Sequence, residues 1–219
     1  MDVRTKVVIA ILVILIVIWI LLNIRVEPKL SGNEVSFESI KDQMKTGDVI
    51  SMSTSYFLKK VVIGNYLGCD AIHTAMVVRV KKGRIESNDV LIAPLEVESG
   101  RGSKGELYLL EIGPYGSWPF RKSDVRFTPL QKALETCSHP IFGWTPIDRE
   151  INFTDEDLKH YRDYRYNYFV PTMFSPYKKY KVCSTFVAKI HEDKGIGTEH
   201  HVRSPCDYYD DTRTVLFIL

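Results

Sequence analysis

The longest hydrophobic run of the chain lies close to its N-terminus. Sixteen apolar residues, Val7 to Leu22, follow one another without a break, and a helix needs about 20 residues, with about 17 as the lower limit, to cross a bilayer. A cleaved signal peptide is the competing interpretation, but its apolar run ends at a small-residue cleavage site, whereas this run ends in Trp-Ile-Leu-Leu-Asn. The pattern therefore predicts an uncleaved, single-pass membrane anchor within residues 1–25. Basic residues on both sides leave its orientation open: Arg4, Lys6, Arg25 and Lys29.

After a polar linker at 26–36, hydrophobic periodicity predicts one domain over residues 37–219. Strands are expected at 47–53, 73–80, 89–95, 106–113 and 124–130, with a hairpin-like turn at 81–84 and a loop at 99–105. Helices are expected at 37–44, 56–68, 154–169 and 183–195, with Thr154 as an N-cap and Gly195 as a C-terminal stop. Strands clustered between flanking helices indicate an α+β fold around an antiparallel sheet packed on helices.

Composition narrows the possible functions only a little. The chain has 29 Lys+Arg against 27 Asp+Glu, and a net charge of +2 gives no electrostatic case for nucleic-acid binding. Its four cysteines are widely spaced and form no CxxC motif: Cys69, Cys137, Cys183 and Cys206. This spacing indicates neither a disulfide scaffold nor a zinc site, and no cofactor is predicted.

One cysteine stands at the start of a predicted amphipathic helix. Cys183, Val187 and Ile190 share one helix face with Phe186 beside them, so the thiol is expected to point inward. Unpaired N–H groups and the positive dipole end at a helix N-terminus favour a thiolate over a thiol. The alternative is a small apolar side chain that fills core space.

A nucleophilic cysteine needs a base, and a histidine is the usual choice. His191 lies more than two helical turns from Cys183 and cannot reach it. His73 immediately precedes the apolar strand "TAMVV", so its ring is expected to be held rigidly at the start of a strand. His139 is the alternative base. His160 is expected on a solvated helix face, and His200 and His201 lie in a polar stretch.

A third polar group is expected to orient the histidine. Glu111 is a carboxylate near the end of the otherwise apolar strand "LYLLEIG". A charge in that position is typical of a strand end, an edge or a functional site. Weaker alternatives lie in polar contexts: Asp70, Glu86, Glu96 and Glu98.

Several short motifs, taken in order, resemble a known family. The segments "TGDVISMS", "IHTAMVV", "LYLLEIG", "YKVCSTFVAKIHEDKGI" and "SPCDYYDD" are similar to the circularly permuted branch of the NlpC-like papain superfamily, the YiiX-like cysteine hydrolases. The resemblance implies a papain-like fold with Cys183 as nucleophile, His73 as base and Glu111 as the third member. Tyr180 matches an aromatic residue that often precedes the cysteine, and Ser184 follows it in the Cys-Ser pair.

The chain also departs from the family pattern. Thr74 and Ala75 stand where the family often has a small residue such as glycine, and the region 114–150 matches no part of the pattern. The N-terminal anchor is not typical of every member.

Together with the anchor predicted from the apolar run, the resemblance implies a membrane-anchored thiol hydrolase that cleaves an amide, ester or thioester bond in an acylated, peptide or lipid substrate. Two alternatives use the same fold: an acyltransferase like the LRAT-type relatives, and an inactive binding protein. For the latter, the Tyr-rich stretch "HYRDYRYNYF" is either a contact surface or the packed face of an amphipathic helix. A redox thiol is disfavoured because no resolving cysteine lies near Cys183. The sequence gives no oligomeric state.

Overall fold

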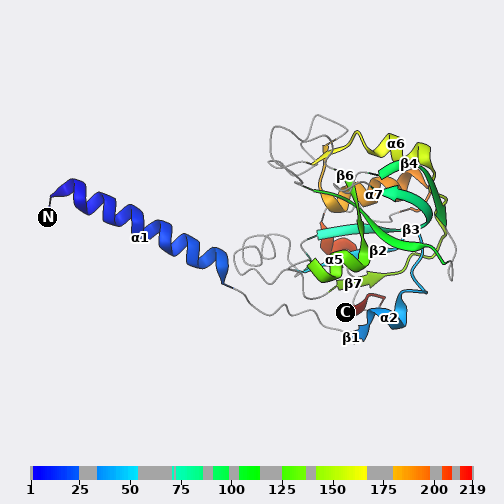
Figure 1. Ribbon diagram of the computed structural model, residues 1–219, viewed down its shortest axis with the longest axis horizontal. Coiled ribbons are helices and arrows are strands. Elements are labelled where there is room, and N and C mark those ends of the chain that lie inside the picture. The colour runs from blue at the N-terminus through cyan, green and yellow to red at the C-terminus, as the bar shows by residue number, and fades with distance from the viewer. Residues whose placement is uncertain are drawn as a thin grey trace.

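The N-terminal helix stands apart from a folded α+β domain. The computed structural model describes residues 2–24, 34–53, 71, 73–85, 91–98, 104–113, 125–136, 142–166, 180–197, 204–208 and 213–218. Helix α1 (Val3–Asn23) is capped at its N-terminus by Asp2, whose carboxylate accepts the Thr5 N–H at 2.7 Å. Its segment Val3–Leu21 has a mean hydropathy of 2.6 and no buried part, and it projects away from the domain (Figure 1). By length and composition, α1 is able to cross a membrane.

The domain is built on an eight-stranded mixed sheet. Seven strands follow the order β1-β10-β7-β2-β3-β5-β6, and β4 pairs with β3. Their bounds are β1 Glu34–Ser36, β2 Val49–Met52, β3 His73–Ile85, β4 Leu91–Glu98, β5 Glu106–Ile112, β6 Val125–Pro129, β7 Phe142–Thr145 and β10 Val215–Ile218. The prediction of an α+β sheet fold is confirmed. The sheet is not purely antiparallel, however, because β1 runs parallel to β10 at one edge.

Several elements differ from the sequence-based expectation. The predicted turn at 81–84 is part of β3, which continues to Ile85. The segment "KKGR" stays in the strand because the register against β4 shifts there. The predicted helix at 154–169 ends early: α6 covers Asp155–Tyr161, and the chain then enters β8 (Arg165–Tyr166), which pairs with β9 (Tyr180–Lys181). The predicted helix at 56–68 lies outside the described residues.

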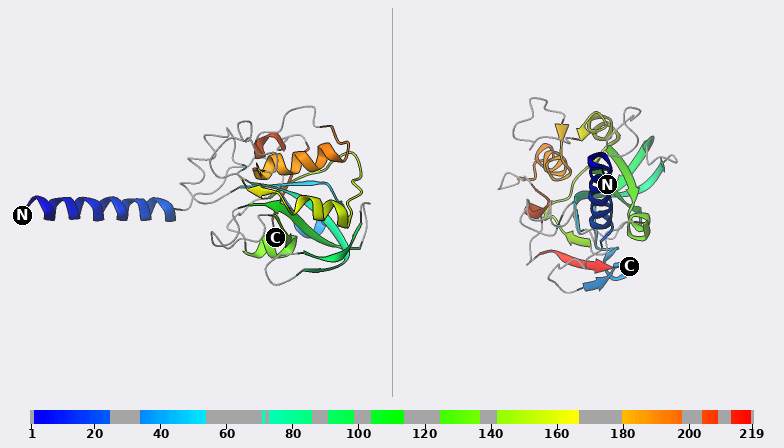
Figure 2. Two further views of the ribbon diagram at one scale, coloured as in Figure 1. Left: turned by 90° about the horizontal axis from the view of Figure 1, so that it is seen from above. Right: turned by 90° about the vertical axis from the view of Figure 1, so that its left-hand side faces the viewer.

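Helices cover both faces of the sheet (Figure 2). Helix α7 (Cys183–Asp193) and α6 pack on one face, where Phe186, Val187 and Ile190 join strand residues in one buried cluster. Helices α2 (Phe37–Ile40) and α5 (Leu130–Thr136) pack on the other face and form a second cluster. Alternation along the strands explains this division, since successive side chains of a strand point to opposite faces.

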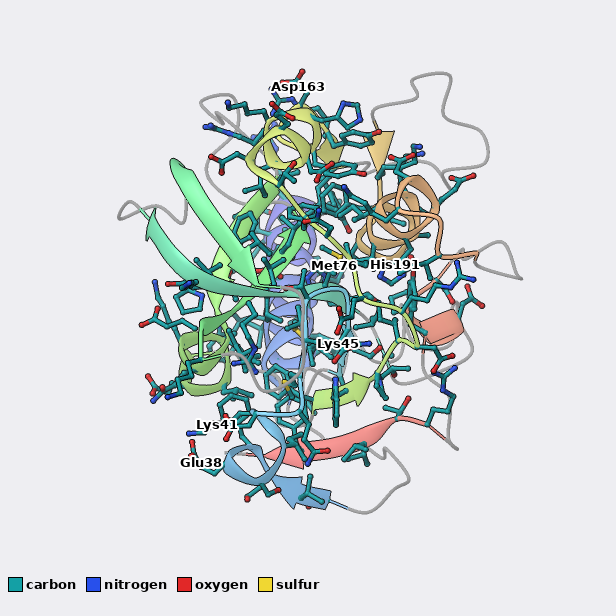
Figure 3. All side chains as sticks on the ribbon, turned by 90° about the vertical axis from the view of Figure 1, so that its right-hand side faces the viewer. Glu38, Lys41, Lys45, Met76, Asp163 and His191 are labelled. Carbon is teal, nitrogen blue, oxygen red and sulfur yellow. The ribbon has the colours of Figure 1, made fainter. Side chains whose placement is uncertain are left out.

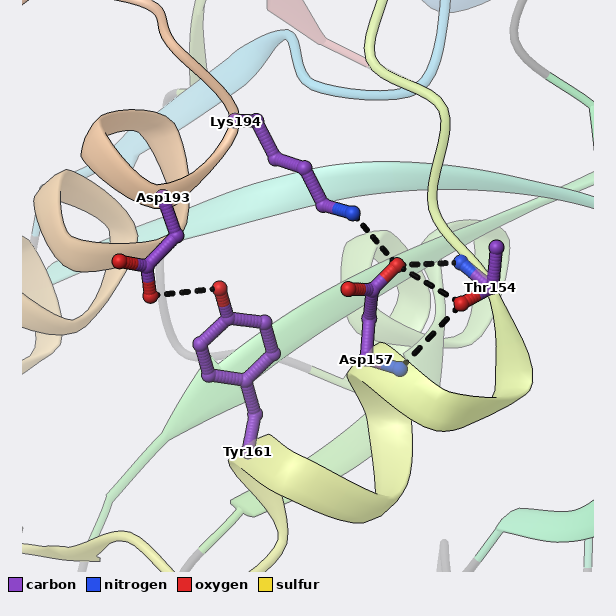
Figure 4. Close-up of polar contacts among 5 residues, drawn as sticks. All are labelled: Thr154, Asp157, Tyr161, Asp193 and Lys194. Atoms are coloured by element: carbon purple, nitrogen blue, oxygen red, sulfur yellow. Dashed lines mark hydrogen bonds and ion pairs between the residues drawn. The ribbon is translucent and has the colours of Figure 1, made fainter.

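Polar contacts join α6 to the C-terminal end of α7, the helix that begins at Cys183 (Figure 4). The Tyr161 hydroxyl donates to Asp193 at 2.9 Å, and the Lys194 ammonium group donates to Asp157 at 2.6 Å. Thr154 caps α6 as predicted, because its hydroxyl oxygen accepts the Asp157 N–H. The Tyr161 and Tyr164 side chains are buried, which favours packing over a contact surface for this part of the Tyr-rich stretch.

The turn before β2 holds α7 through a buried histidine. The ring Nε2 atom of His191 donates to the Gly47 carbonyl oxygen at 2.9 Å, and Figure 3 shows His191 between α7 and the strand that carries Met76. Asp48 stabilises the same turn, since its carboxylate accepts the Trp144 indole N–H at 2.9 Å and the backbone N–H of Lys45 and of Ile147 at 3.0 Å. Burial lowers the pKa of His191 to about 4, although the Gly47 carbonyl opposes the shift.

Candidate active site

His73 and Glu111 meet at one end of the sheet. His73 is the first residue of β3, and Glu111 is the penultimate residue of β5. The register pairs Met76 with Leu110, so the odd-numbered residues of both strands share a face. On that face the His73 Nε2 atom lies 2.7 Å from the Glu111 Oε2 atom.

The second oxygen of Glu111 is held from the neighbouring strand β6. The Arg126 Nε atom donates to Oε1 at 2.9 Å, and the Thr128 hydroxyl donates to the same oxygen at 2.7 Å. Glu111 is only 4% exposed. Burial alone raises its pKa, but the contacts with His73, Arg126 and Thr128 outweigh burial and hold the pKa of this carboxyl well below its ordinary value. Glu111 is therefore ionised at neutral pH.

Cys183 joins these two residues from helix α7, which packs on the opposite face of the sheet. It is the first residue of α7, a free thiol and 5% exposed, whereas Cys206 is disulfide-bonded. Burial raises the pKa of the Cys183 thiol, but the charge and hydrogen bond of His73 and the backbone N–H groups of Thr74 and Ser184 reverse the shift and lower it. Since Nε2 of His73 faces Glu111, Nδ1 is the ring nitrogen left for the thiol.

The pKa of His73 shifts in the opposite direction to that of Cys183. Burial lowers the pKa of His73, but Cys183 and Glu111 outweigh burial and raise it above its ordinary value. A lowered thiol pKa beside a raised imidazole pKa favours the ion pair of thiolate and imidazolium. The arrangement supplies a nucleophile, a proton carrier and an orienting carboxylate, which together are able to attack a carbonyl carbon.

The start of α7 also supplies hydrogen-bond donors. The first intrahelical bond runs from the Phe186 N–H to the Val182 carbonyl at 2.9 Å, so the N–H groups of the preceding turn point out of the helix. Val182 has no side-chain cap. Such donors beside a nucleophile are suited to an oxyanion.

The structure places the other sequence candidates as follows. Ser184 is fully buried, and no hydrogen-bond partner of its hydroxyl lies in the described part of the chain. His160 is exposed on α6. The side chains of Tyr180, Glu96 and Glu98 fall outside the described residues, as do Asp70, Glu86, His139, His200 and His201.

Sequence reasoning missed Arg126 and Thr128. A signal for them was present, because "VRFTP" alternates strictly: Val125 and Phe127 enter one core cluster, and Arg126 and Thr128 point to the other face. That face also carries Glu111. Over the described residues, no group of three or more His, Cys, Asp or Glu side chains converges in the manner of metal ligands.

Comparison of the chain with protein-family models, with curated proteins and with solved structures finds no match. The geometry of Cys183, His73 and Glu111 is therefore the basis for inferring a function.

Proposed function

We propose that this protein is a membrane-anchored cysteine hydrolase of the circularly permuted papain-like type. The observation that supports the proposal is that the His73 ring interacts both with the Cys183 thiol and with the Glu111 carboxylate. The thiol lies at the start of a helix and the ring at the start of a strand. The order of the three residues in the chain, His-Glu-Cys, agrees with the permuted family pattern.

In the proposed reaction, the Cys183 thiolate attacks the carbonyl carbon of an amide, ester or thioester. A carbon–sulfur bond forms, and the carbonyl electron pair moves to the oxygen, where N–H groups at the start of α7 stabilise the charge. The His73 imidazolium gives its proton to the leaving group as the bond to that group breaks. A thioester between the substrate acyl group and Cys183 remains.

Water then releases the acyl group. The neutral His73 ring removes a proton from the water as the oxygen attacks the thioester, and the departing sulfur leaves as thiolate beside the regenerated imidazolium. Glu111 keeps the ring in the tautomer and orientation that both steps need. An acyltransferase differs only in that an amine or alcohol takes the place of water.

The proposed anchor supports a lipid or lipid-modified substrate. Helix α1 would hold the domain at a bilayer, where acyl chains are concentrated. A soluble peptide substrate needs no such tether, so the anchor favours the acylated class among those that the sequence leaves open.

A labelling experiment on the full chain in detergent micelles tests the proposal. An electrophilic probe with a fatty acyl chain should label wild type at Cys183, fail on Cys183→Ala and label His73→Ala at least about 10²-fold more slowly, because the base is lost. His160→Ala is the matched control, since this exposed histidine lies on α6, and should label like wild type. Equal labelling of wild type and His73→Ala would contradict the mechanism.

Turnover is measured separately with fluorogenic thioester and amide substrates. Release of product by wild type but not by Cys183→Ala supports hydrolysis, and transfer to an added amine supports the acyltransferase. Probe labelling without turnover on any acyl substrate favours the inactive binding protein.

A further inference from the structure

Arg126 lies directly opposite Glu111 in the β5–β6 register. Its Nε atom and the Thr128 hydroxyl bind Oε1 of Glu111, while Oε2 faces His73. The carboxylate is thus held from both of its oxygens, and its plane cannot rotate without breaking one of these contacts. Neither β6 residue has a role in the reaction proposed above.

A charge count gives Arg126 a specific task. The charged form of the site holds two anions, the Cys183 thiolate and the Glu111 carboxylate, but only one cation on the reacting groups, the His73 imidazolium. Cys183 and Glu111 are 5% and 4% exposed, and an uncompensated buried charge is costly. Over these four groups alone, the Arg126 guanidinium, whose Nε atom lies 2.9 Å from Glu111 Oε1, brings the sum of charges to zero.

We propose that Arg126 is a positioning residue of this site, which acts through Glu111 to keep the Cys183–His73 pair in its charged form. The inference rests on the proposed function, because it concerns the same thiol. Among the described residues, the charged or titratable groups facing Glu111 are His73 from β3 and Arg126 from β6, and Cys183 from α7 faces His73. Arg126 itself is about one-third exposed, at 32%.

The competing role for Arg126 is purely structural. Opposite charges directly across two strands stabilise a sheet, and removing either one weakens the pairing of β5 with β6. A structural role predicts lower thermal stability with an unchanged titration of Cys183. A positioning role predicts that the thiolate itself becomes less favourable, because a cation near an anionic group has been removed.

The test measures the ultraviolet absorbance of the thiolate against pH in the full chain, as the difference from Cys183→Ala. At a fixed pH on the acid limb, Arg126→Gln should lower the thiolate fraction roughly five- to tenfold, since one pKa unit is a factor of ten. Arg126→Lys keeps the charge and should restore most of the fraction. Arg213→Gln is the matched control, because Arg213 forms an exposed ion pair with Asp148 at 3.0 Å, and should titrate like wild type.

An Arg126→Gln variant that is less stable but titrates like wild type would overturn the inference and leave the proposed function intact. If that variant fails to fold, Arg126→Lys decides, because a large loss of thiolate despite the retained charge would also overturn it. A wild-type thiol that titrates as an ordinary cysteine would overturn both proposals. A charged pair that responds to Arg126 without any turnover would overturn the hydrolase alone.

Discussion

His73 and Glu111 are 38 residues apart in the chain, yet their Nε2 and Oε2 atoms lie 2.7 Å apart. The pairing of β3 with β5 brings them together on one face of the sheet, and burial strengthens the interaction between ring and carboxylate. The contact orients His73 while leaving its other nitrogen for Cys183.

Replacing Glu111 by Gln should slow the reaction of Cys183 without unfolding the protein. The amide keeps an oxygen that accepts the His73 N–H but loses the negative charge that stabilises the imidazolium. Its NH2 group then faces the Arg126 and Thr128 donors, which lowers stability by about 1–3 kcal/mol. We expect the labelling rate at neutral pH to fall on the order of 10²-fold. Circular dichroism of the same samples checks that the fold is retained, and an unchanged rate in a folded variant would remove Glu111 from the mechanism.

His191 should make stability depend on pH in the acid range. Its folded-state pKa, about 4, lies below the unfolded value of about 6.5, so its contribution is fully present above pH ~6.5 and is lost as pH falls toward ~4. The whole pKa difference between the two states corresponds to about 3 kcal/mol of unfolding free energy. Urea unfolding of wild type at several pH values should show this slope.

The variant His191→Gln isolates that contribution. Its side-chain amide still donates to the Gly47 carbonyl but does not titrate, so the difference in unfolding free energy between wild type and variant should shrink or reverse as pH falls. His160→Gln is the control, because that ring is exposed. A difference that is constant with pH would show that His191 is not buried in neutral form.

Gly47→Ala should be strongly destabilising. Gly47 has a φ of 102°, and an added Cβ would lie 2.5 Å from Ile151 Cδ1 and 2.6 Å from Ile147 Cδ1. Backbone strain and overpacking together should cost about 2–4 kcal/mol in urea unfolding. Gly195→Ala separates the two effects, because Gly195 has a φ of 71° but no atom within 4 Å of the added Cβ, and should cost only about 1 kcal/mol. Equal costs would argue against close packing at the turn.

Removing residues 1–25 should release a soluble domain. No part of the candidate span Val3–Leu21 is buried in the structure, so its loss should leave the thermal midpoint and the labelling of Cys183 unchanged. The truncated and full-length proteins are compared in the same detergent. Aggregation or loss of the unfolding transition in the truncated chain would place this segment within the fold.

Local patterns were sufficient for the elements that carry the proposed site. The apolar run determined α1, β-branched residues determined the strand that begins at His73, and helical spacing with a closing glycine determined α7. The strands β7 and β10 were missed because a run of four residues is ambiguous by itself, and partners that lie far away in the sequence stabilise them. Strand β2 is equally short, but it follows a Gly-Asp turn that marks its start. The early end of α6 was missed for the same reason, since the pairing of β8 with β9 competes with helix extension.

The sequence by itself determined which residue types stand at strand and helix starts, and so it named Cys183, His73 and Glu111 as candidates. Only the tertiary structure decided that these three side chains meet, that Arg126 and Thr128 hold the second carboxylate oxygen, and that His191 binds the turn at Gly47. The physical reason is that periodicity specifies the face on which a side chain lies but not the strand beside it. Strand order and register depend on contacts between distant segments, and those contacts set the burial and charge balance on which the proposed chemistry depends.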